Sequence, residues 1–236
     1  MPNISRRCFL AAAAGAVAAP SISSPAVEVP VVLDHILLGC SDLDHGIDLV
    51  EKDLGVRAAF GGVHPGRGTR NALLSLGEKH YLEIIAPDPR QPEASDFRNL
   101  RKLAAPRLVG WAARPGDLDQ FSSRLRDAGI VFEGPQPGSR QRPDGGILHW
   151  KTLTLKDDRD GLLPFFIEWG SGSLHPSADA PAGSKLLSFE LAAPDVPDLR
   201  KACELLELDV PLERGYKPQL RARFAGPKGQ VLDLTS

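Results

Sequence analysis

The sequence has little cysteine and no excess of charge of either sign. Its 236 residues include three cysteines, and 28 basic residues stand against 30 acidic ones. No basic stripe with interleaved aromatic residues is present, so nucleic acid is not expected as a partner. Beyond the N-terminal segment only Cys40 and Cys203 remain. We expect both to be buried as apolar side chains, while their pairing in an oxidising compartment is left open by the sequence.

Long hydrophobic runs are also missing. The small-residue run at 11–19 is far below the roughly 20 apolar residues of a membrane span, so no span is expected in the mature chain. It follows SRRCFL at 5–10, a twin-arginine start, and contains AVA at 16–18, a cleavage pattern of A-x-A type. Residues 1–26 are therefore predicted to be a twin-arginine export signal, which makes the mature protein periplasmic or secreted. An uncleaved anchor and a disordered tail are the alternatives.

An internal repeat dominates the rest of the chain. A short apolar strand followed by an aspartate occurs three times, as LDHILL at 33–38, LVGWAA at 108–113 and LSFELA at 187–192. Each strand precedes a helical stretch, and each copy ends in an apolar strand with one acid in its middle: Glu83, Glu168 and Asp233. A repeated supersecondary unit indicates that neighbouring copies bury a face against each other. The matching acids indicate a site.

The repeat sets the predicted domain organisation, of α+β class. Residues 31–86 and 107–170 are predicted to form two modules of strand-helix-strand-strand-strand order (βαβββ) within a domain of residues 27–170. Residues 171–185 form a linker, and residues 186–236 a third, βαβββ-like module. Glycine, proline and polar residues predict loops at 61–68 and 134–146.

Three stretches carry a resemblance to a known family. LDHI at 33–36, GVHPGRGTRNA at 62–72 and YLEII at 81–85 resemble the glyoxalase-like domain of the vicinal oxygen chelate superfamily. That group includes glyoxalase I, bleomycin-resistance proteins, extradiol dioxygenases and methylmalonyl-CoA epimerase. The resemblance covers most of the mature chain, and its most specific part is the HPxxGTxN stretch at 64–71. It implies paired βαβββ modules whose curled sheets form a cup, with a divalent metal on the inner faces of the first and last strands.

Strand alternation indicates which side chains enter this cup. Successive side chains of a strand face opposite sides, so His35 is expected inside and Ile36 against the helix. Glu83 and Glu168 are flanked by large apolar residues that we expect to pack on helices, so both carboxylates are expected inside as well. A buried charge is costly unless it is paired or binds a metal. The alternative is a hydrogen-bonded core histidine with internal salt bridges from the carboxylates to Arg70, Arg107 or Lys151.

Together with the resemblance, this predicts a metal site. His35, Glu83 and Glu168 are the predicted ligands, and the two carboxylates are also predicted to be catalytic. Counted back from each helix start, the second-module equivalent of His35 is Gly110, so the superfamily's four-ligand set is incomplete. One imidazole and two carboxylates suit Mn, Zn, Ni or Mg. Either the site is open to water or substrate, as catalytic metal sites are, or it has lost its metal.

Residues near the glycine-rich loop are predicted to meet a small-molecule substrate. His64 is a candidate catalytic residue, with a structural loop imidazole as the alternative, and Arg67 is placed to meet an anion. Asn71, His149 and Trp150 complete the predicted substrate-binding set, although the facing of His149 depends on strand register. The remaining histidines are expected at the surface: His45, His80 and His175.

Two functions stay open at this point. The first is a metal-dependent lyase or isomerase that acts on a small oxygenated compound, with the metal as Lewis acid and one carboxylate moving a proton. The second is a metal-free protein that binds and sequesters a small molecule, as bleomycin-resistance proteins do. The three hard ligands favour the first function, and the missing ligand favours the second. The sequence leaves a homodimer open.

Overall fold

The computed structural model describes residues 29–92, 96–142 and 144–236. The predicted export signal at 1–26 lies outside the described residues and stays a prediction. The described chain contains these elements in order: β1 (Leu33–Gly39), α1 (Leu43–Leu54), β2 (Ala59–His64), β3 (Thr69–Ser75), β4 (Tyr81–Pro87), η1 (Phe97–Lys102), β5 (Arg107–Ala113), α2 (Leu118–Asp127), β6 (Phe132–Gln141), β7 (Ile147–Leu155), β8 (Phe165–Trp169), η2 (Pro176–Ala178), β9 (Lys185–Ala193), α3 (Val196–Leu205), β10 (Leu212–Arg214), β11 (Gln219–Ala225) and β12 (Val231–Thr235).

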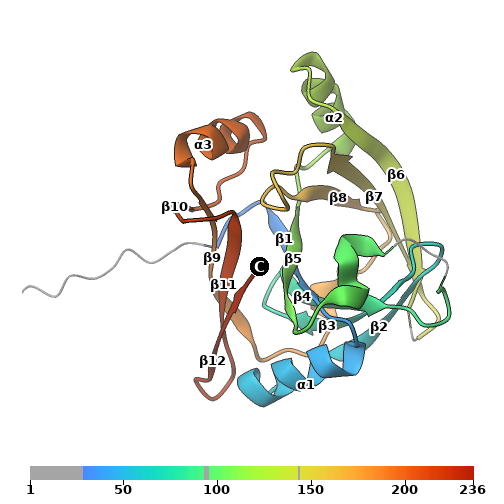
Figure 1. Cartoon of the computed structure of the whole chain (residues 1–236). Coiled ribbons are helices and arrows are strands. Elements are labelled where there is room, and N and C mark those ends of the chain that lie inside the picture. Colours follow the sequence, from blue (N-terminus) through green and yellow to red (C-terminus); the bar gives the residue numbers. More distant parts are fainter. Residues whose placement is uncertain (1–28, 93–95, 143) are drawn as a thin grey trace, which may run out of the picture.

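Eight strands form one curled sheet of order β2-β3-β4-β1-β5-β8-β7-β6. The first module supplies four strands and the second supplies the other four, in mirrored order about the seam between β1 and β5. The first strand of each module runs parallel to its last strand, and β1 runs antiparallel to β5. The edge strands β2 and β6 contact each other, so the sheet curls around a central space (Figure 1). The predicted cup of paired modules is confirmed.

The pairing of β1 with β5 relates the two modules by a local two-fold. Leu37 pairs with Gly110, and His35 pairs with Ala112. The two-fold axis passes through the central pair, Ile36 and Trp111. Rotation about it places His35 at the position of Gly110 and Leu37 at the position of Ala112. This agrees with the equivalence counted from the helix starts in the sequence.

Each helix begins after one of the repeated aspartates. The side chains of Asp42, Asp117 and Asp195 accept hydrogen bonds from backbone N–H groups of the first turn at 2.9, 2.8 and 3.0 Å, which satisfies donors that a helix start leaves unpaired. Gly55 ends α1 with φ 74°, a left-handed conformation that glycine adopts without strain. Helix α1 packs on β3 and β4, and α2 packs on β6, β7 and β8, so both helices cover the outer face of the curled sheet.

Two stretches that were predicted as loops are largely strands. Strand β2 continues to His64, and β6 runs through Gln141. Strand β6 contains Pro135 and Pro137, and its pairing with β7 is shifted between Glu133 and Gln136. Proline is tolerated here because β6 is an edge strand and the pairing is irregular. The loop prediction for 134–141 is wrong because composition does not distinguish an edge strand from a turn.

The third module has the predicted element order but a different strand pairing. In the cup modules the first strand pairs with the last, whereas β9 pairs with β10 and β11 in a separate sheet of order β10-β9-β11-β12. This sheet contacts β5 and α1, and the ring of Phe189 lies 5.2 Å from that of Trp111. The third module therefore extends the core outside the cup and is not another cup half. Its acid Asp233 forms an exposed ion pair with Arg223.

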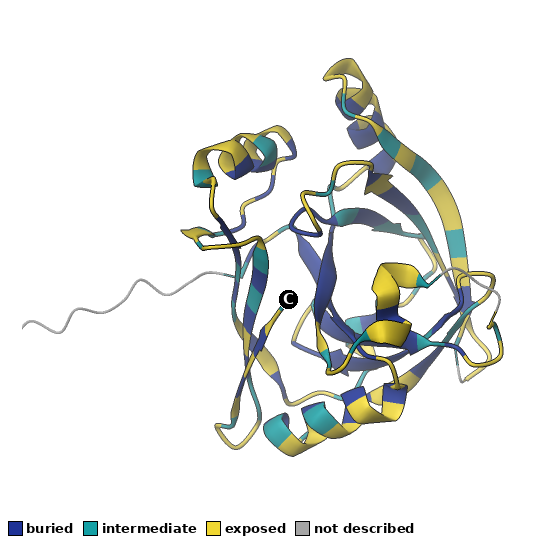
Figure 2. Cartoon of the chain, in the orientation of Figure 1, coloured by how far each residue is buried: buried dark blue, intermediate teal, exposed yellow. Residues whose placement is uncertain are grey.

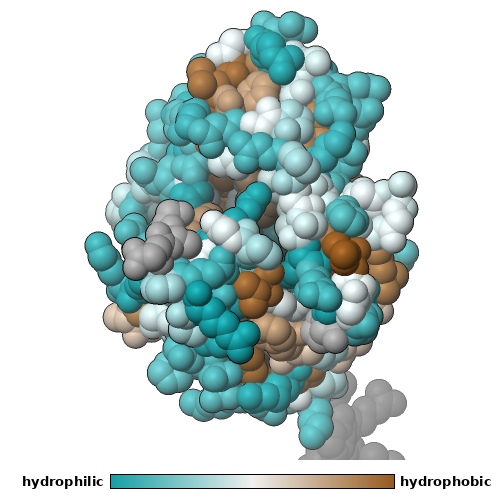
Figure 3. Space-filling view, turned by 90° about the vertical axis from the view of Figure 1, so that its right-hand side faces the viewer, coloured by the Kyte–Doolittle hydropathy of each residue, from teal (hydrophilic) through white to brown (hydrophobic). Residues whose placement is uncertain are grey.

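Buried apolar residues of all three modules form one main core cluster. Burial is nearly complete along β1, β4 and β5, while much of β6 is exposed (Figure 2). Cys40 and Cys203 are buried and unpaired, so their predicted burial is confirmed. No described helix is long and apolar enough to cross a membrane. The face shown in Figure 3 is mostly hydrophilic, with hydrophobic side chains in small separate patches.

Candidate active site

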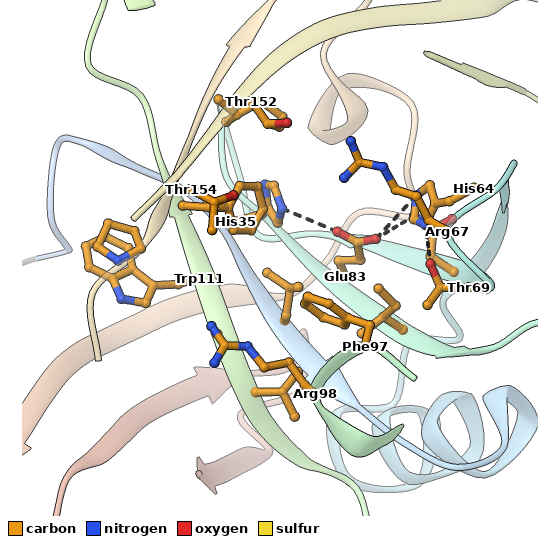
Figure 4. A pocket seen from close by; sticks show the side chains of 18 of the residues that line it. His35, His64, Arg67, Thr69, Glu83, Phe97, Arg98, Trp111, Thr152 and Thr154 are labelled. Atoms are coloured by element: carbon orange, nitrogen blue, oxygen red, sulfur yellow. Dashed lines mark hydrogen bonds and ion pairs between the residues drawn. The ribbon is translucent and has the colours of Figure 1, made fainter. Parts of the chain in front are cut away.

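The cup encloses a cavity of about 380 Å³. Alternate side chains of the inner faces line it, and its second-module wall is largely aromatic and apolar. The polar groups of the first module gather around Glu83 (Figure 4). The lining includes His35, His64, Arg67, Thr69, Asn71, Tyr81, Glu83, Arg140, Trp150, Phe165, Ile167 and Trp169.

A chain of charged side chains runs along the first module. Asp34 Oδ1 lies 2.6 Å from His35 Nδ1, and His35 Nε2 lies 3.3 Å from Glu83 Oε2. All three residues are buried, with exposed fractions of 0%, 2% and 6%. Tyr81 stacks on the His35 ring at 4.5 Å, and Phe165 contacts that ring edge-on at 5.5 Å. The imidazole is therefore held by two carboxylates and by two aromatic rings.

A second group of side chains fixes the other oxygen of Glu83. Asn71 Nδ2 donates to Glu83 Oε1 at 2.8 Å and lies 3.4 Å from His64 Nε2. Since an amide nitrogen only donates, the facing His64 Nε2 carries the lone pair. His64 Nδ1 then donates to Thr69 Oγ1 at 2.8 Å. His64 Nε2 is 3.8 Å from Glu83 Oε1, so a neutral imidazole lies beside a carboxylate.

The electrostatics of this network favour different charge states for its two histidines. Burial lowers the pKa of His35, but hydrogen bonds to Asp34 and Glu83 outweigh it and raise the pKa to about 9. Burial raises the pKa of Glu83, while the hydrogen bond and attraction to His35 lower it to about 2. For His64 burial is the largest influence, and it lowers the pKa below 6.5. At neutral pH His35 is cationic, Glu83 is anionic and His64 is neutral.

The second module lacks the histidine and the glutamate at the two matching strand positions. Gly110 replaces His35, and a Cβ added to Gly110 would meet no atom within 4 Å. Leu37 pairs with Glu83 as Ala112 pairs with Phe165, so Phe165 is the equivalent of Glu83. The His35–Glu83 pair of the first module therefore has no counterpart in the second, which contributes other polar side chains to the cavity: Arg140, Thr152 and Thr154.

The prediction that Glu168 points into the cup is wrong. Its neighbours Ile167 and Trp169 line the cavity, so Glu168 lies on the outer face of β8. There its Oε2 accepts a hydrogen bond from the backbone N–H of Leu118 at 2.7 Å, at the start of α2. A carboxylate is favourable at that end of a helix. Glu168 thus supports a helix start.

His149 is also misplaced by the prediction. It is exposed on the outer side of β7, whereas Trp150, Thr152 and Thr154 line the cavity. The other predicted side chains lie where they were expected: His35, His64, Arg67, Asn71, Glu83 and Trp150 all line the cavity. Their roles stay predictions.

The sequence prediction missed residues that support or line this site. Asp34 holds His35 and also meets Arg114 Nε at 3.3 Å and Trp169 Nε1 at 3.1 Å. His175, expected at the surface, lies 3.2 Å from Asp34 through its Nε2. An acid inside an otherwise apolar strand was the available signal for Asp34. Arg140 lines the cavity from the stretch that was predicted as a loop.

The donors do not converge as ligands of one metal ion. Among the described residues, no group of three His, Cys, Asp or Glu side chains is placed to hold a metal. Glu83 lies between His35 and His64 and turns a different oxygen toward each (Figure 4). Gly110 and Phe165 occupy the matching second-module positions, and Glu168 points away. The divalent metal implied by the resemblance does not fit this donor set as it is placed.

The fold and site define a protein of the paired βαβββ class whose buried histidine–glutamate pair lies in the first half of the cup. The family model of the glyoxalase-like domain matches residues 33–206, well over half of the chain. The chain therefore belongs to the glyoxalase-like domain family, within the vicinal oxygen chelate superfamily. No curated protein matches the chain significantly in sequence.

Solved structures share the fold at low sequence identity. A hypothetical protein from Staphylococcus aureus aligns with a TM-score of 0.62 and 14% identity, over 85% of this chain and 84% of that one. Methylmalonyl-CoA epimerase from Mycobacterium tuberculosis aligns with a TM-score of 0.43 and 21% identity, over 63% and 92%. A variant of the Streptomyces coelicolor methylmalonyl-CoA epimerase aligns with a TM-score of 0.42 and 18% identity, over 61% and 100%. The similarity to the Staphylococcus aureus protein shows a shared fold and nothing about activity. The alignments with the epimerases are too weak to indicate an activity of this chain.

Proposed function

We propose that the cup binds a small oxygenated compound and transfers a proton on it, as lyases and isomerases do at a carbon next to a carbonyl group. The observation that carries this proposal is the pairing of neutral His64 with ionised Glu83 at the polar end of a cavity, at 3.8 Å. Burying charged groups beside a cavity is costly. A functional role toward a bound ligand would account for this cost in folding free energy.

His64 is the base in this proposal. A general base works best when its pKa lies near the working pH. The pKa of Glu83, about 2, makes that carboxylate a weak base, whereas His64 keeps its lone pair at neutral pH because burial lowers its pKa. When His64 Nε2 accepts a proton, the resulting imidazolium is stabilised by Glu83. Opposite charges about 4 Å apart attract by roughly 4 kcal/mol near a protein surface.

The neighbouring residues hold this pair in place. Asn71 donates to Glu83 Oε1, and His35 donates to Glu83 Oε2 while Asp34 fixes the opposite side of its ring. Thr69 accepts from His64 Nδ1 and keeps Nε2 directed at Glu83. The aromatic side chains of the second module place a weakly polar wall beside these groups, and a lower local dielectric strengthens electrostatic interactions.

Deuterium exchange tests the proposal. Wild-type protein is incubated in D₂O with pyruvate, hydroxyacetone and lactaldehyde, and loss of the proton signal next to the carbonyl is followed by NMR. We expect accelerated exchange of at least one compound, unchanged by EDTA and lowered about a hundredfold in His64→Gln. The His149→Gln variant, altered outside the cup, is the matched control.

Two results would overturn it. Exchange that stops with EDTA and returns with Mn or Zn would establish the metal-dependent function. No exchange with any compound, together with unaltered ligand binding in His64→Gln, would favour the metal-free sequestering protein.

A further inference from the structure

Arg140 is a buried cation without a partner. Only 4% of the residue is exposed, and its guanidinium forms neither an ion pair nor a hydrogen bond with any described residue. Its Nη1 lies at the seam between β6 and β2, 3.0 Å from the position that a Cβ on Gly62 would occupy. Arginine side chains are seldom buried without a paired group. This one lines the cavity, so the missing partner is expected there.

The charges around Arg140 indicate how much negative charge is missing. Asp34 is held by Arg114 and by cationic His35, and His35 also meets Glu83. These groups comprise two carboxylates and two cations, so they balance each other. Arg140 feels the charge of Glu83 but forms no ion pair among the described residues, and it is the buried one of two such cations at the cavity, the other being the exposed Arg67. A single negative charge on a ligand would neutralise Arg140.

The shape of the Arg140 guanidinium indicates which kind of anionic group it would bind. Its planar fork matches two oxygens of a carboxylate or of a phosphate, and the single charge of a carboxylate is the closer match to the one buried cation. The hydroxyl group of Tyr81, a buried residue of the same cavity, also has no hydrogen-bond partner among the described residues, and Arg67 lies exposed at the cavity. We propose that the cup recognises a small organic monocarboxylate, whose carboxylate binds Arg140. This inference rests on the proposed function only in taking the cup as a small-molecule site.

Recognition of a monocarboxylate predicts a specific response to anions. Melting temperatures are measured at constant ionic strength in sodium chloride, acetate, pyruvate, benzoate and phosphate, with acetamide as the neutral control. Pyruvate or benzoate is expected to stabilise the wild-type protein more than chloride or acetamide does, because a ligand bound only to the folded state stabilises it. Isothermal titration of the best carboxylate then gives its affinity. A larger effect of phosphate than of every carboxylate would overturn the monocarboxylate assignment.

Variants separate ligand binding from a structural role. Arg140→Met is expected to weaken carboxylate binding roughly ten- to hundredfold, because a charge-assisted hydrogen bond is lost. The same variant is expected to melt higher than wild type without ligand, since an unpaired buried charge has been removed. Arg140→Lys keeps the charge without the fork and should bind with intermediate affinity. Arg142→Gln, which removes a cation paired with Asp144 and Asp179, should bind like wild type.

Two results would contradict the assignment of Arg140 as a carboxylate-binding residue. Equal carboxylate affinity in wild type and Arg140→Met, or no carboxylate-specific stabilisation of wild type, would show that Arg140 is structural. Because these experiments measure binding, they can succeed even when the exchange assay shows no proton transfer, and the two proposals fail independently.

Discussion

The two halves of the cup share a fold and differ in chemistry. The first module places His35 and Glu83 on the inner faces of its first and last strands, and the second places Gly110 and Phe165 at the matching positions. Both modules keep the same strand order and the same aspartate at the helix start. Fold and site are therefore specified by different residues: apolar strands and capping aspartates set the module, and a few inward-facing side chains decide whether it carries chemistry.

The largest expected difference between the halves concerns their acids. Glu83→Gln removes the charge that stabilises protonated His64, so the exchange rate should fall about a hundredfold or more. Glu168→Gln alters only the start of α2, so the rate should be unchanged and stability should fall by about 0.5 kcal/mol. NMR exchange rates and urea unfolding of both variants measure these effects. Equal loss of rate in the two variants would remove the distinction between the halves.

The second prediction compares the pH dependence of stability. The pKa of His35 rises from 6.5 to about 9 on folding, so its contribution is fully present below pH 6.5 and is lost as the pH rises through about 9. A rise of this size corresponds to roughly 3 kcal/mol. Urea unfolding between pH 6 and 10 should show this loss in wild type.

Two variants control this measurement. This loss of stability at high pH should be absent in His35→Gln. It should be unchanged in His149→Gln, because the side chain of His149 is exposed on the outer side of β7. The same pH dependence in wild type and His35→Gln would contradict the assignment of a cationic His35.

The smallest expected effect lies at the empty position of the second half. A Cβ at Gly110 meets no atom within 4 Å, and alanine in a strand is more stable than glycine by roughly 0.5–1 kcal/mol. Gly110→Ala should therefore stabilise the protein slightly in urea unfolding. Gly39→Ala is the control, because its Cβ would lie 2.5 Å from Val109 and should destabilise the protein. A destabilised Gly110→Ala would show that this side of the cup is filled.

The sequence predicted the modules well because each is encoded locally. Strand alternation correctly placed His35 and Glu83, since the neighbours of both residues on the opposite face are buried in the main core. The same reasoning failed for Glu168, because the inner face of β8 is also apolar, with Phe165, Ile167 and Trp169 lining the cavity. An apolar residue then no longer identifies the helix-covered face.

Other features depend on contacts between distant segments. The sequence predicts a loop at Arg140 because glycine and proline precede it. Only the pairing of β6 with β7 shows that Arg140 lies on a strand at the cavity. His175 meets Asp34 across 141 residues of sequence. No local sequence pattern predicts such contacts. The hydrogen bond between His175 and Asp34 could therefore not be predicted from the sequence.

Metal content tests most directly the claim that the site works without a resident metal. Protein purified without chelator is analysed by inductively coupled plasma mass spectrometry, and its melting temperature is measured with Mn or Zn. We expect substoichiometric metal and no stabilisation of wild type. A Gly110→His, Phe165→Glu double variant, with ligands restored in the second half, should be stabilised by the metal. Stoichiometric metal in wild type that disappears in Glu83→Gln would contradict the claim.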